Sequence, residues 1–409
     1  MSNPSARLVQ DSVTRIQRNP NDLPAWSQLF MVFAQARDHA NLQGLVTARQ
    51  QALGDGLGFY YYVMRDLLAL RQDQVALEVI EQIPAGHVLA PVGLYMRGLA
   101  AARLERSDEA VALIRRAVEQ FERPDLKAYA ARDKLFNDYA SRHMATEAGL
   151  LLDAEEVRAL GAAPAEPPPE LSFHGEAPPG AGPVLLAACD KGYFSRFGDG
   201  LIQSVAAATG GAQLLHLHIV GPDAATERQI AALTAAHPFL RISTEPGEYR
   251  AAYYACSRFL VLRQLLDRYR RLIVATDVDI RVLKPLDGIA RAMAGADLGW
   301  FEGGKQLPLP TLFCDCRLTA FADTAASRHV LDLFEHYIRG KYAEGSKWMI
   351  DQGGLWSLSR ALGPSLRRVD LGRSLGPDYD GVLVPVEEQD TKLALRDAAN
   401  QADAPGSPQ

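Results

Sequence analysis

Two aspartates at the end of an apolar run carry the first chemical signal in this sequence. Residues 271–283 read Arg-Leu-Ile-Val-Ala-Thr-Asp-Val-Asp-Ile-Arg-Val-Leu, so Asp277 and Asp279 follow a stretch typical of a buried strand. Residues two apart on an extended chain project to the same side, and ligands of α/β proteins bind at the carboxyl ends of strands. A hard divalent cation takes oxygen ligands and is often shared with substrate phosphates. The pattern favours a metal site serving a nucleotide-diphosphate substrate; the alternative is a solvated turn.

Two other segments offer groups that suit such a substrate. Asp190 and Tyr193 follow an apolar run at 184–188; a carboxylate can accept from a pyrimidine N–H, and a tyrosine ring can stack on the base. Arg258 begins a helix expected over 253–268, and arginine suits phosphate or sugar hydroxyls. The alternatives are a turn aspartate with an aromatic at a helix start, and an ordinary surface arginine.

A third segment, Trp348-Met-Ile-Asp-Gln-Gly-Gly-Leu355, opens a helix expected over 351–360. Asp351 there is either a sugar-binding carboxylate or a helix N-cap. Glycine is unfavourable inside a helix, so Gly353 and Gly354 indicate either a close approach of the backbone to a ligand or a late helix start.

The order and spacing of these segments resemble the retaining A-type glycosyltransferases, in particular the family that includes glycogenin and bacterial lipopolysaccharide galactosyltransferases. The resemblance covers about residues 183–360. It rests on Ala188, Asp190 and Tyr193, on Tyr254 and Arg258, on Asp277-Val-Asp279 followed by Leu-Lys-Pro-Leu at 283–286, and on Asp351-Gln352.

The resemblance implies a donor site for a UDP-sugar. Ala188 would belong to the nucleotide-binding segment, Asp190 would recognise the uracil edge, and Tyr193 would stack on the base. Asp277 would contact the ribose and the metal, and Asp279 would ligate the metal, Mn²⁺ or Mg²⁺.

The resemblance also implies catalytic residues. Arg258 would lie near the donor sugar and diphosphate, Asp351 would hold sugar hydroxyls, and Gln352 would lie close to the anomeric carbon. Because Gln352 is not a strong nucleophile, we expect front-face displacement with retention.

Two departures from that family pattern affect the metal and the sugar. Relatives supply a third metal ligand from a histidine after the late helix, whereas the last histidine here is His336. The carboxylates of Asp370, Asp378 or Asp380, or water, would have to take that place. In addition, Phe313-Cys-Asp-Cys316 stands where relatives often carry Phe-Asn-x-Gly, so the identity of the sugar does not transfer.

Residues 183–390 alternate between strand-like and helical segments, which predicts an α/β fold with a Rossmann-like, mostly parallel sheet. The resemblance implies that this sheet is of the glycosyltransferase A type. We expect strands at 184–188, 214–220, 240–244, 272–276, 297–301 and 311–316. We expect helices at 198–208, 224–235, 253–268, 286–294, 325–339 and 351–360. A polar tail at 391–409 follows.

Residues 1–162 predict an all-α helical repeat domain, which a Pro/Gly-rich linker at 163–182 joins to the α/β domain. Trp26, Tyr60 and Leu94 recur every 34 residues, as do Leu42, Ala76 and Ala110. This period resembles the tetratricopeptide repeat; an irregular helical bundle is the alternative. Helices expected at 125–140 and 155–161 would cap the stack. Repeat surfaces bind partners, so we expect this domain to dock a protein or glycan acceptor.

Composition excludes some other functions. A net charge of −6 argues against a nucleic-acid partner. The N-terminus lacks a secretory h-region, no run approaches a membrane span, and four cysteines in a chain of 409 residues do not form a disulfide framework. We therefore expect a cytoplasmic protein with free thiols. A zinc site at Cys314 and Cys316 lacks a second ligand pair.

Together these features predict a metal-dependent glycosyltransferase that moves a hexose from a UDP-sugar to a hydroxyl acceptor. The main alternative is a repeat-based scaffold with a catalytically degenerate transferase-like domain. A sugar nucleotidyltransferase fits less well, because Lys191-Gly192 is not a Gly-rich loop.

Overall fold

The computed structural model describes residues 4–36, 38–53, 72–81, 90–121, 144–162, 167–176, 180, 182–303, 309–375 and 383–385. The chain separates into two compact units. Unit 1 comprises Met1–Asp153 together with Gly304–Phe313, and unit 2 comprises Ala154–Gly303 together with Cys314–Gln409. No helix in the described part of the chain is both long and apolar enough to cross a membrane.

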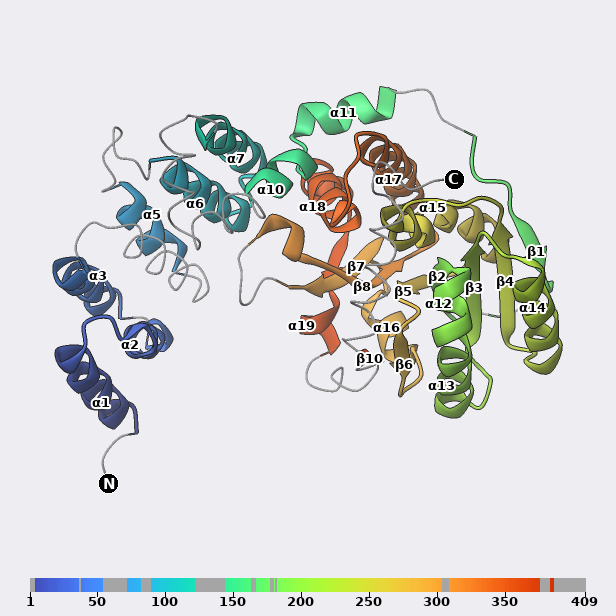
Figure 1. The fold of residues 1–409 in the computed structure, drawn as a ribbon, viewed down its shortest axis with the longest axis horizontal. Coiled ribbons are helices and arrows are strands. Elements are labelled where there is room, and N and C mark those ends of the chain that lie inside the picture. The colour runs from blue at the N-terminus through green and yellow to red at the C-terminus, as the bar shows by residue number, and fades with distance from the viewer. Residues whose placement is uncertain are drawn as a thin grey trace, which may run out of the picture. The chain divides into compact units, whose positions relative to one another are not determined.

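Unit 1 is helical wherever it is described (Figure 1). Its helices are α1 (Pro4–Arg18), α2 (Leu23–Gln35), α3 (His39–Leu53), α5 (Asp73–Glu81), α6 (Ala90–Arg103), α7 (Ser107–Phe121) and α10 (Ala145–Leu150), with a short 3₁₀ turn η3 (Pro310–Leu312). Helices consecutive along the chain pack against each other, α1 on α2, α2 on α3, α5 on α6 and α6 on α7.

The α6–α7 pair shows why small residues recur in unit 1. A Cβ atom added at Gly98 would lie 2.7 Å from Cγ1 of Ile114 and 3.2 Å from the carbonyl oxygen of Ala110. Such distances are too short for a side chain, so glycine allows the two helices to approach closely. Trp26, Leu42 and Ala76, at periodic positions of the sequence, are buried. The repeat itself stays a prediction, since Tyr60 and the helix expected at 125–140 lie outside the described residues.

Unit 2 is built on a sheet of eight described strands in the order β1-β4-β3-β2-β5-β8-β7-β9. The strands are β1 (Ser172–His174), β2 (Val184–Asp190), β3 (Leu214–Val220), β4 (Leu240–Glu245), β5 (Ile273–Thr276), β7 (Leu298–Glu302), β8 (Cys314–Phe321) and β9 (Arg368–Asp370). β1 and β8 are antiparallel to their neighbours and the others run parallel. The predicted mostly parallel α/β sheet is therefore confirmed. A separate small ribbon pairs β6 (Ile280–Val282) with β10 (Leu383–Pro385).

Helices cover both faces of this sheet (Figure 1). One face packs a hydrophobic cluster that includes Leu201, Ile230 and Ile289 from its helices and Leu185 and Leu217 from its strands. The helices of unit 2 are α11 (Ala154–Ala162), α12 (Lys191–Tyr193), η2 (Phe194–Gly198), α13 (Asp199–Thr209), α14 (Ala224–Ala236), α15 (Ala251–Tyr269), α16 (Asp287–Ala292), α17 (Ala325–Ala343), α18 (Ile350–Ala361), η4 (Gly363–Ser365) and α19 (Leu371–Leu375). α15 packs against β2, β3 and β5 and carries α17 on its other side.

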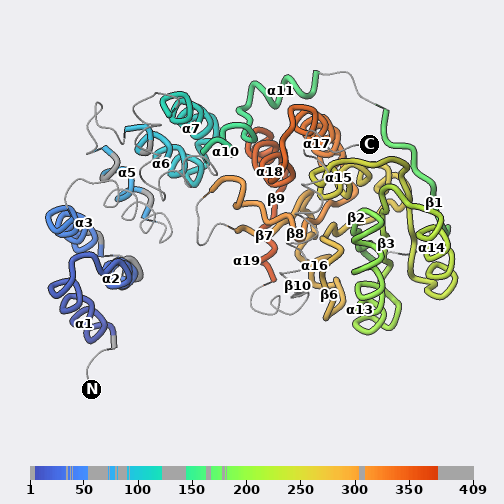
Figure 2. The backbone as a smooth tube through the Cα atoms, in the orientation of Figure 1, coloured from blue at the N-terminus to red at the C-terminus, as the bar shows by residue number. Residues whose placement is uncertain are grey.

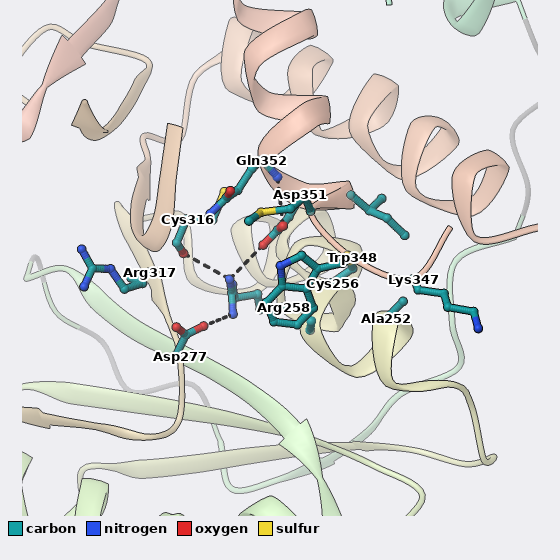
Figure 3. A pocket seen from close by; sticks show the side chains of 13 residues that line it. Ala252, Cys256, Arg258, Asp277, Cys316, Arg317, Lys347, Trp348, Asp351 and Gln352 are labelled. Atoms are coloured by element: carbon teal, nitrogen blue, oxygen red, sulfur yellow. Dashed lines mark hydrogen bonds and ion pairs between the residues drawn. The ribbon is translucent and has the colours of Figure 1, made fainter. Parts of the chain in front are cut away.

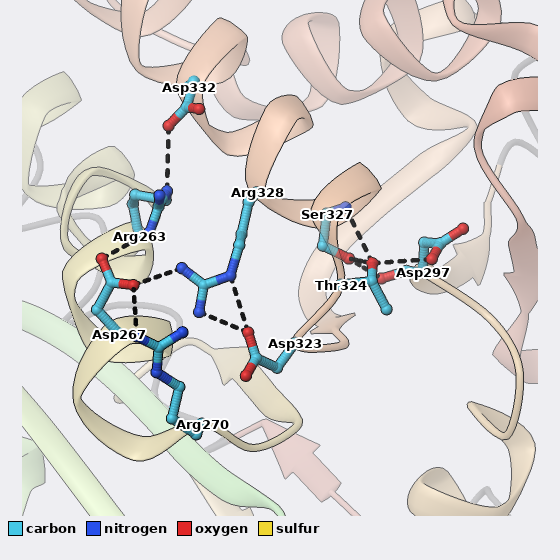
Figure 4. A network of polar contacts seen from close by, with 9 residues as sticks. All are labelled: Arg263, Asp267, Arg270, Asp297, Asp323, Thr324, Ser327, Arg328 and Asp332. Atoms are coloured by element: carbon cyan, nitrogen blue, oxygen red, sulfur yellow. Dashed lines mark hydrogen bonds and ion pairs between the residues drawn. The ribbon is translucent and has the colours of Figure 1, made fainter.

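Charged side chains fasten α17 to α15 (Figure 4). Arg328 of α17 bonds both to Asp323 and to Asp267 of α15, and Arg263 of α15 pairs with Asp332 of α17. These pairs fix the helix whose C-terminus leads into α18.

The sequence prediction differs from the structure in three places. A strand was expected at 311–316, but Pro310 begins a 3₁₀ turn and the strand starts at Cys314. The expected linker contains β1, which pairs with β4. α11, expected to cap the helical repeats, instead groups with unit 2 and packs against α17 and α18.

Candidate functional site

The order of the strands marks the place where a ligand would bind. From β2 the chain moves outward to β3 and β4, then returns to the other side of β2 with β5 (Figure 2). Such a reversal between adjacent parallel strands opens a crevice beyond their carboxyl ends. Asp190 is the last residue of β2, and Asp277 directly follows β5. The topology thus places two of the predicted site residues at the switch point.

Asp190 shapes the start of the following helix. Its Oδ1 atom accepts hydrogen bonds from the backbone N–H groups of Gly192, at 2.6 Å, and Tyr193, at 2.9 Å. This is the capping arrangement that the sequence left open as the structural alternative. It holds Tyr193 at the mouth of the crevice, where the ring packs against Phe197 with centroids 5.3 Å apart.

Three acidic side chains act on the ionisation of Tyr193. Burial raises the pKa of Tyr193, and the negative charges of Asp279, Asp190 and Asp277 raise it further. Burial likewise raises the pKa of Cys189, with Asp190 and Asp279 adding to the effect. The structure therefore brings together residues of β2 and β5 that are far apart in sequence.

Ala188 lies two residues before Asp190, in β2. It pairs in register with His218 of β3 and is 7% exposed. A small side chain at this position leaves room near the carboxyl end of the strand.

Arg258 is the centre of the second half of the site (Figure 3). It belongs to α15 and is 5% exposed. Its Nη1 atom lies 2.5 Å from Oδ1 of Asp277, and its Nη2 atom donates to Oδ2 of Asp351 at 3.2 Å and to the carbonyl oxygen of Cys316 at 3.1 Å. The surface-arginine alternative is therefore wrong, since this guanidinium joins α15, α18 and the ends of β5 and β8.

Burial and the neighbouring opposite charges act in opposite directions on the pKa values of Arg258, Asp277 and Asp351. Burial alone would lower the pKa of Arg258, but the carboxylates of Asp277 and Asp351 outweigh it and raise that pKa. Burial raises the pKa values of Asp277 and Asp351, and the nearby Arg258 cation opposes that rise. The arginine thus opposes the effect of burial on two partly buried carboxylates that line the same pocket.

Asp351 is in the first turn of α18, whereas the N-cap is Met349. Its Oδ1 atom accepts from the backbone N–H of Gln352 at 2.9 Å, and its other oxygen faces Arg258. The N-terminus of a helix favours a negative charge at this position. Gly354 has a packing role: an added Cβ atom would lie 2.5 Å from Phe334 and 2.6 Å from Tyr337 of α17. The sequence led us to expect either a close approach of the backbone to a ligand or a late helix start, whereas the structure shows Gly354 inside α18 and packed against these two rings.

A pocket of about 200 Å³ joins these elements. It is lined by Ala252, Ala255, Cys256, Arg258, Asp277, Cys316, Arg317, Lys347, Trp348, Met349, Ile350, Asp351 and Gln352 (Figure 3). Sequence reasoning missed Cys256 and Lys347 as lining residues, because nothing in their local pattern marks them. Cys316 belongs to the segment that the resemblance related to the identity of the donor sugar. The four cysteines are free and buried.

The predicted metal ligands are two carboxylates, Asp277 and Asp279. Among the described residues no three His, Cys, Asp or Glu side chains form a group that could hold a metal ion. Asp370 accepts from the backbone N–H groups of Gly372 and Glu302, and Asp378 and Asp380 lie outside the described residues. Two carboxylates still suit Mg²⁺ or Mn²⁺, because such ions are commonly held by one or two carboxylates together with substrate phosphates and water.

No protein-family model and no curated protein sequence match this chain. Solved structures do resemble it. The bifunctional glycosyltransferase WbbM, in its apo structure, is 14% identical with a TM-score of 0.33, over 45% of this chain and 39% of that one. GlyE, a glycosyltransferase of Streptococcus pneumoniae TIGR4, is 9% identical with a TM-score of 0.37, over 54% of this chain and 59% of that one.

Mouse xyloside xylosyltransferase 1, also in its apo form, is 11% identical with a TM-score of 0.30, over 46% of this chain and 83% of that one. The chain thus spans less than two thirds of WbbM and of GlyE. At these identities and TM-scores the similarity does not indicate a function, which has to be inferred from the site residues.

Proposed function

We propose that this protein is a metal-dependent glycosyltransferase that moves a hexose from a UDP-sugar to a hydroxyl acceptor. The observation that carries the proposal is the bridge of Arg258 between Asp277 and Asp351 at the switch point of the sheet. A buried arginine beside two carboxylates and the backbone carbonyl of Cys316 suits a diphosphate that enters with a metal ion. Ala188, Asp190 and Tyr193 lie on β2, the neighbour of β5 in the sheet, and on the turn that follows β2.

In this proposal Asp277 and Asp279 hold Mn²⁺ or Mg²⁺ together with the donor diphosphate. The bound ion would neutralise the negative charge that develops on the leaving group. Arg258 is already desolvated and positioned, so it can stabilise the same charge without reorganisation.

The acceptor oxygen forms a bond to the anomeric carbon while the bond from that carbon to the diphosphate oxygen breaks. The electron pair of the broken bond goes to the departing UDP, and the proton of the acceptor hydroxyl passes to the same phosphate oxygen. Asp351 would hold hydroxyls of the donor sugar. Gln352 would lie beside the anomeric carbon; because an amide is a poor nucleophile, the proposal includes retention of configuration.

Unit 1 is proposed to dock the acceptor or a partner. The supporting observation is its separate, helix-on-helix packing, which resembles proteins with extended binding surfaces. The segment Gly304–Phe313, which links β7 to β8 along the chain, groups with unit 1.

Hydrolysis of a panel of UDP-sugars with Mn²⁺ tests the proposed function. We expect slow, metal-dependent release of UDP from at least one hexose donor, abolished in Asp279→Ala. Release from no donor, with or without metal, would contradict it.

The scaffold with a degenerate transferase-like domain remains the second candidate. It is favoured by one observation, that no third protein ligand joins Asp277 and Asp279 within the part of the chain that the structure describes. Binding of UDP without any metal dependence and without turnover would favour it.

A further inference from the structure

Trp348 is an exposed indole at the mouth of the pocket. Its exposed fraction is 61%, whereas those of Trp26, Trp300 and Trp356 are 3%, 3% and 0%. These are the four tryptophans of the chain. A side chain of this size gains several kcal/mol when it is buried, so an exposed indole among the residues that line a pocket is a candidate contact for a ligand.

The segment that presents Trp348 is held in a defined conformation. It lies between the end of α17 at Ala343 and the start of α18 at Ile350. Met349 has a left-handed backbone with φ of 61°, which costs about 1–2 kcal/mol in a residue with a side chain. Strain of this kind persists where the surroundings enforce it, and it clusters at binding sites.

Arg250, at the start of α15, fixes the end of α17. Its backbone N–H donates to the hydroxyl of Tyr342 at 3.1 Å, its guanidinium donates to the carbonyl of the same residue, and the guanidinium carbon lies 4.1 Å from the ring centroid. Trp348 is therefore mounted close to a clamped helix end, a few residues before Asp351.

Trp348 lines the pocket, whereas most of the residues proposed to bind the nucleotide do not. Asp277 lines the pocket, but Asp190, Tyr193 and Asp279 are not among its lining residues. In Figure 3 the indole lies on the side of Arg258 away from Asp277. Oε1 of Gln352, also a lining residue, is buried and has no hydrogen-bond partner among the described residues, so it offers an acceptor for a hydroxyl group.

We propose that Trp348 is the stacking platform of an acceptor subsite that takes a pyranose ring, so that the acceptor is a carbohydrate. This inference rests on the proposed transferase function. The face of an indole is electron-rich and attracts the C–H groups on the face of a pyranose. The hydroxyl groups at the ring edge would then meet polar groups of the pocket, among them Oε1 of Gln352.

The test measures contact between the full-length protein and free sugars. Saturation-transfer NMR is recorded with gluco-, galacto- and manno-configured trisaccharides, for the wild type, Trp348→Ala and Trp348→Phe. Leu104→Ala, which removes another exposed apolar side chain (44% exposed) from unit 1, is the matched control. Stabilisation by UDP with Mn²⁺ is measured on each variant in parallel.

We expect at least one trisaccharide to give a saturation-transfer NMR signal with the wild type and with Leu104→Ala. Its affinity should fall about fivefold or more in Trp348→Ala and be partly retained in Trp348→Phe, with stabilisation by UDP and Mn²⁺ unchanged. The proposal is overturned if Trp348→Ala binds the sugar as tightly as the wild type does. It is also overturned if no trisaccharide gives a saturation-transfer signal with the wild type.

Two outcomes separate this proposal from the proposed function. Loss of UDP stabilisation in Trp348→Ala would assign the indole to the donor base and overturn the acceptor subsite. Sugar contact at Trp348 in a protein that UDP never stabilises would support the carbohydrate site and contradict the transferase.

Discussion

Arg258 and Asp277 are 19 residues apart in sequence, and their side chains meet at 2.5 Å at the carboxyl end of β5. Arg258 is nearly inaccessible to solvent, whereas the Asp277 side chain is 33% exposed. The pair thus has a buried cationic end and a carboxylate that reaches the crevice. This is an arrangement that can receive a diphosphate and its cation from solvent.

Replacing Arg258 should destabilise the protein as well as the site. Arg258→Met leaves the partly buried carboxylates of Asp277 and Asp351 without their shared cation, and breaking a buried ion pair from one side typically costs about 3–5 kcal/mol. Since Asp277 is partly exposed, we expect the free energy of unfolding, measured in urea, to fall by about 3 kcal/mol. Arg263→Met, on the same helix but with a third of its side chain exposed, should cost less than about 1 kcal/mol.

A double variant shows whether the cost of losing Arg258 comes from the carboxylates. Neutralising one of them in Arg258→Met/Asp351→Asn should restore part of the lost stability. Equal losses in the single and the double variant would rule out the bridge as the source.

Gly354→Ala should loosen the contact between α18 and α17. The new methyl group would lie within 2.7 Å of ring atoms of Phe334 and Tyr337, and overpacking of a buried contact costs about 1–3 kcal/mol. Gly340→Ala in α17 is the control, since an added Cβ meets nothing within 4 Å and alanine favours a helix by about 1 kcal/mol. In thermal unfolding we expect Gly354→Ala to lower the melting temperature and Gly340→Ala to raise it. A loss of stability in both variants would contradict the packing argument.

Glu147 gives unit 1 a pH-dependent stability. The side chain is 1% exposed, it accepts from the hydroxyl and backbone N–H of Thr311, and burial raises its pKa from 4.5 to about 7. Because folding favours the protonated form, the stabilisation is complete below pH 4.5 and is lost as the pH rises through about 7.

Glu147→Gln keeps an acceptor for Thr311 and removes the ionisation. Relative to this variant, the wild type should lose roughly 3 kcal/mol of unfolding free energy between those two pH values. Urea unfolding across this range measures the difference. Parallel profiles for the two proteins would show that Glu147 does not titrate in the folded state.

Much of the α/β unit could be predicted from its sequence, because buried parallel strands read as short apolar runs. The runs ending at Ala188 and Thr276 became β2 and β5, and their positions brought Asp190 and Asp277 to one edge. The strand predicted at 311–316 was placed three residues too early, because Pro310 opens a 3₁₀ turn and β8 begins at Cys314.

Other features depend on contacts between distant segments, which no local pattern records. The carbonyl of Cys316 reaches Arg258 only because β8 lies beside β5. Similarly, Gly354 stands out in the sequence as unfavourable in a helix, but only the structure shows that it faces two aromatic rings of α17. His216 and His218 are buried and share Ser243 as a hydrogen-bond partner.

Thermal stabilisation by UDP, measured with and without Mn²⁺ on the wild type and on Asp279→Ala, tests the central claim most directly. We predict that UDP stabilises the wild type more strongly when Mn²⁺ is present and that Asp279→Ala loses this metal-dependent gain. An equal gain with and without Mn²⁺, or an unchanged gain in Asp279→Ala, would contradict a metal–diphosphate site at the ends of β2 and β5.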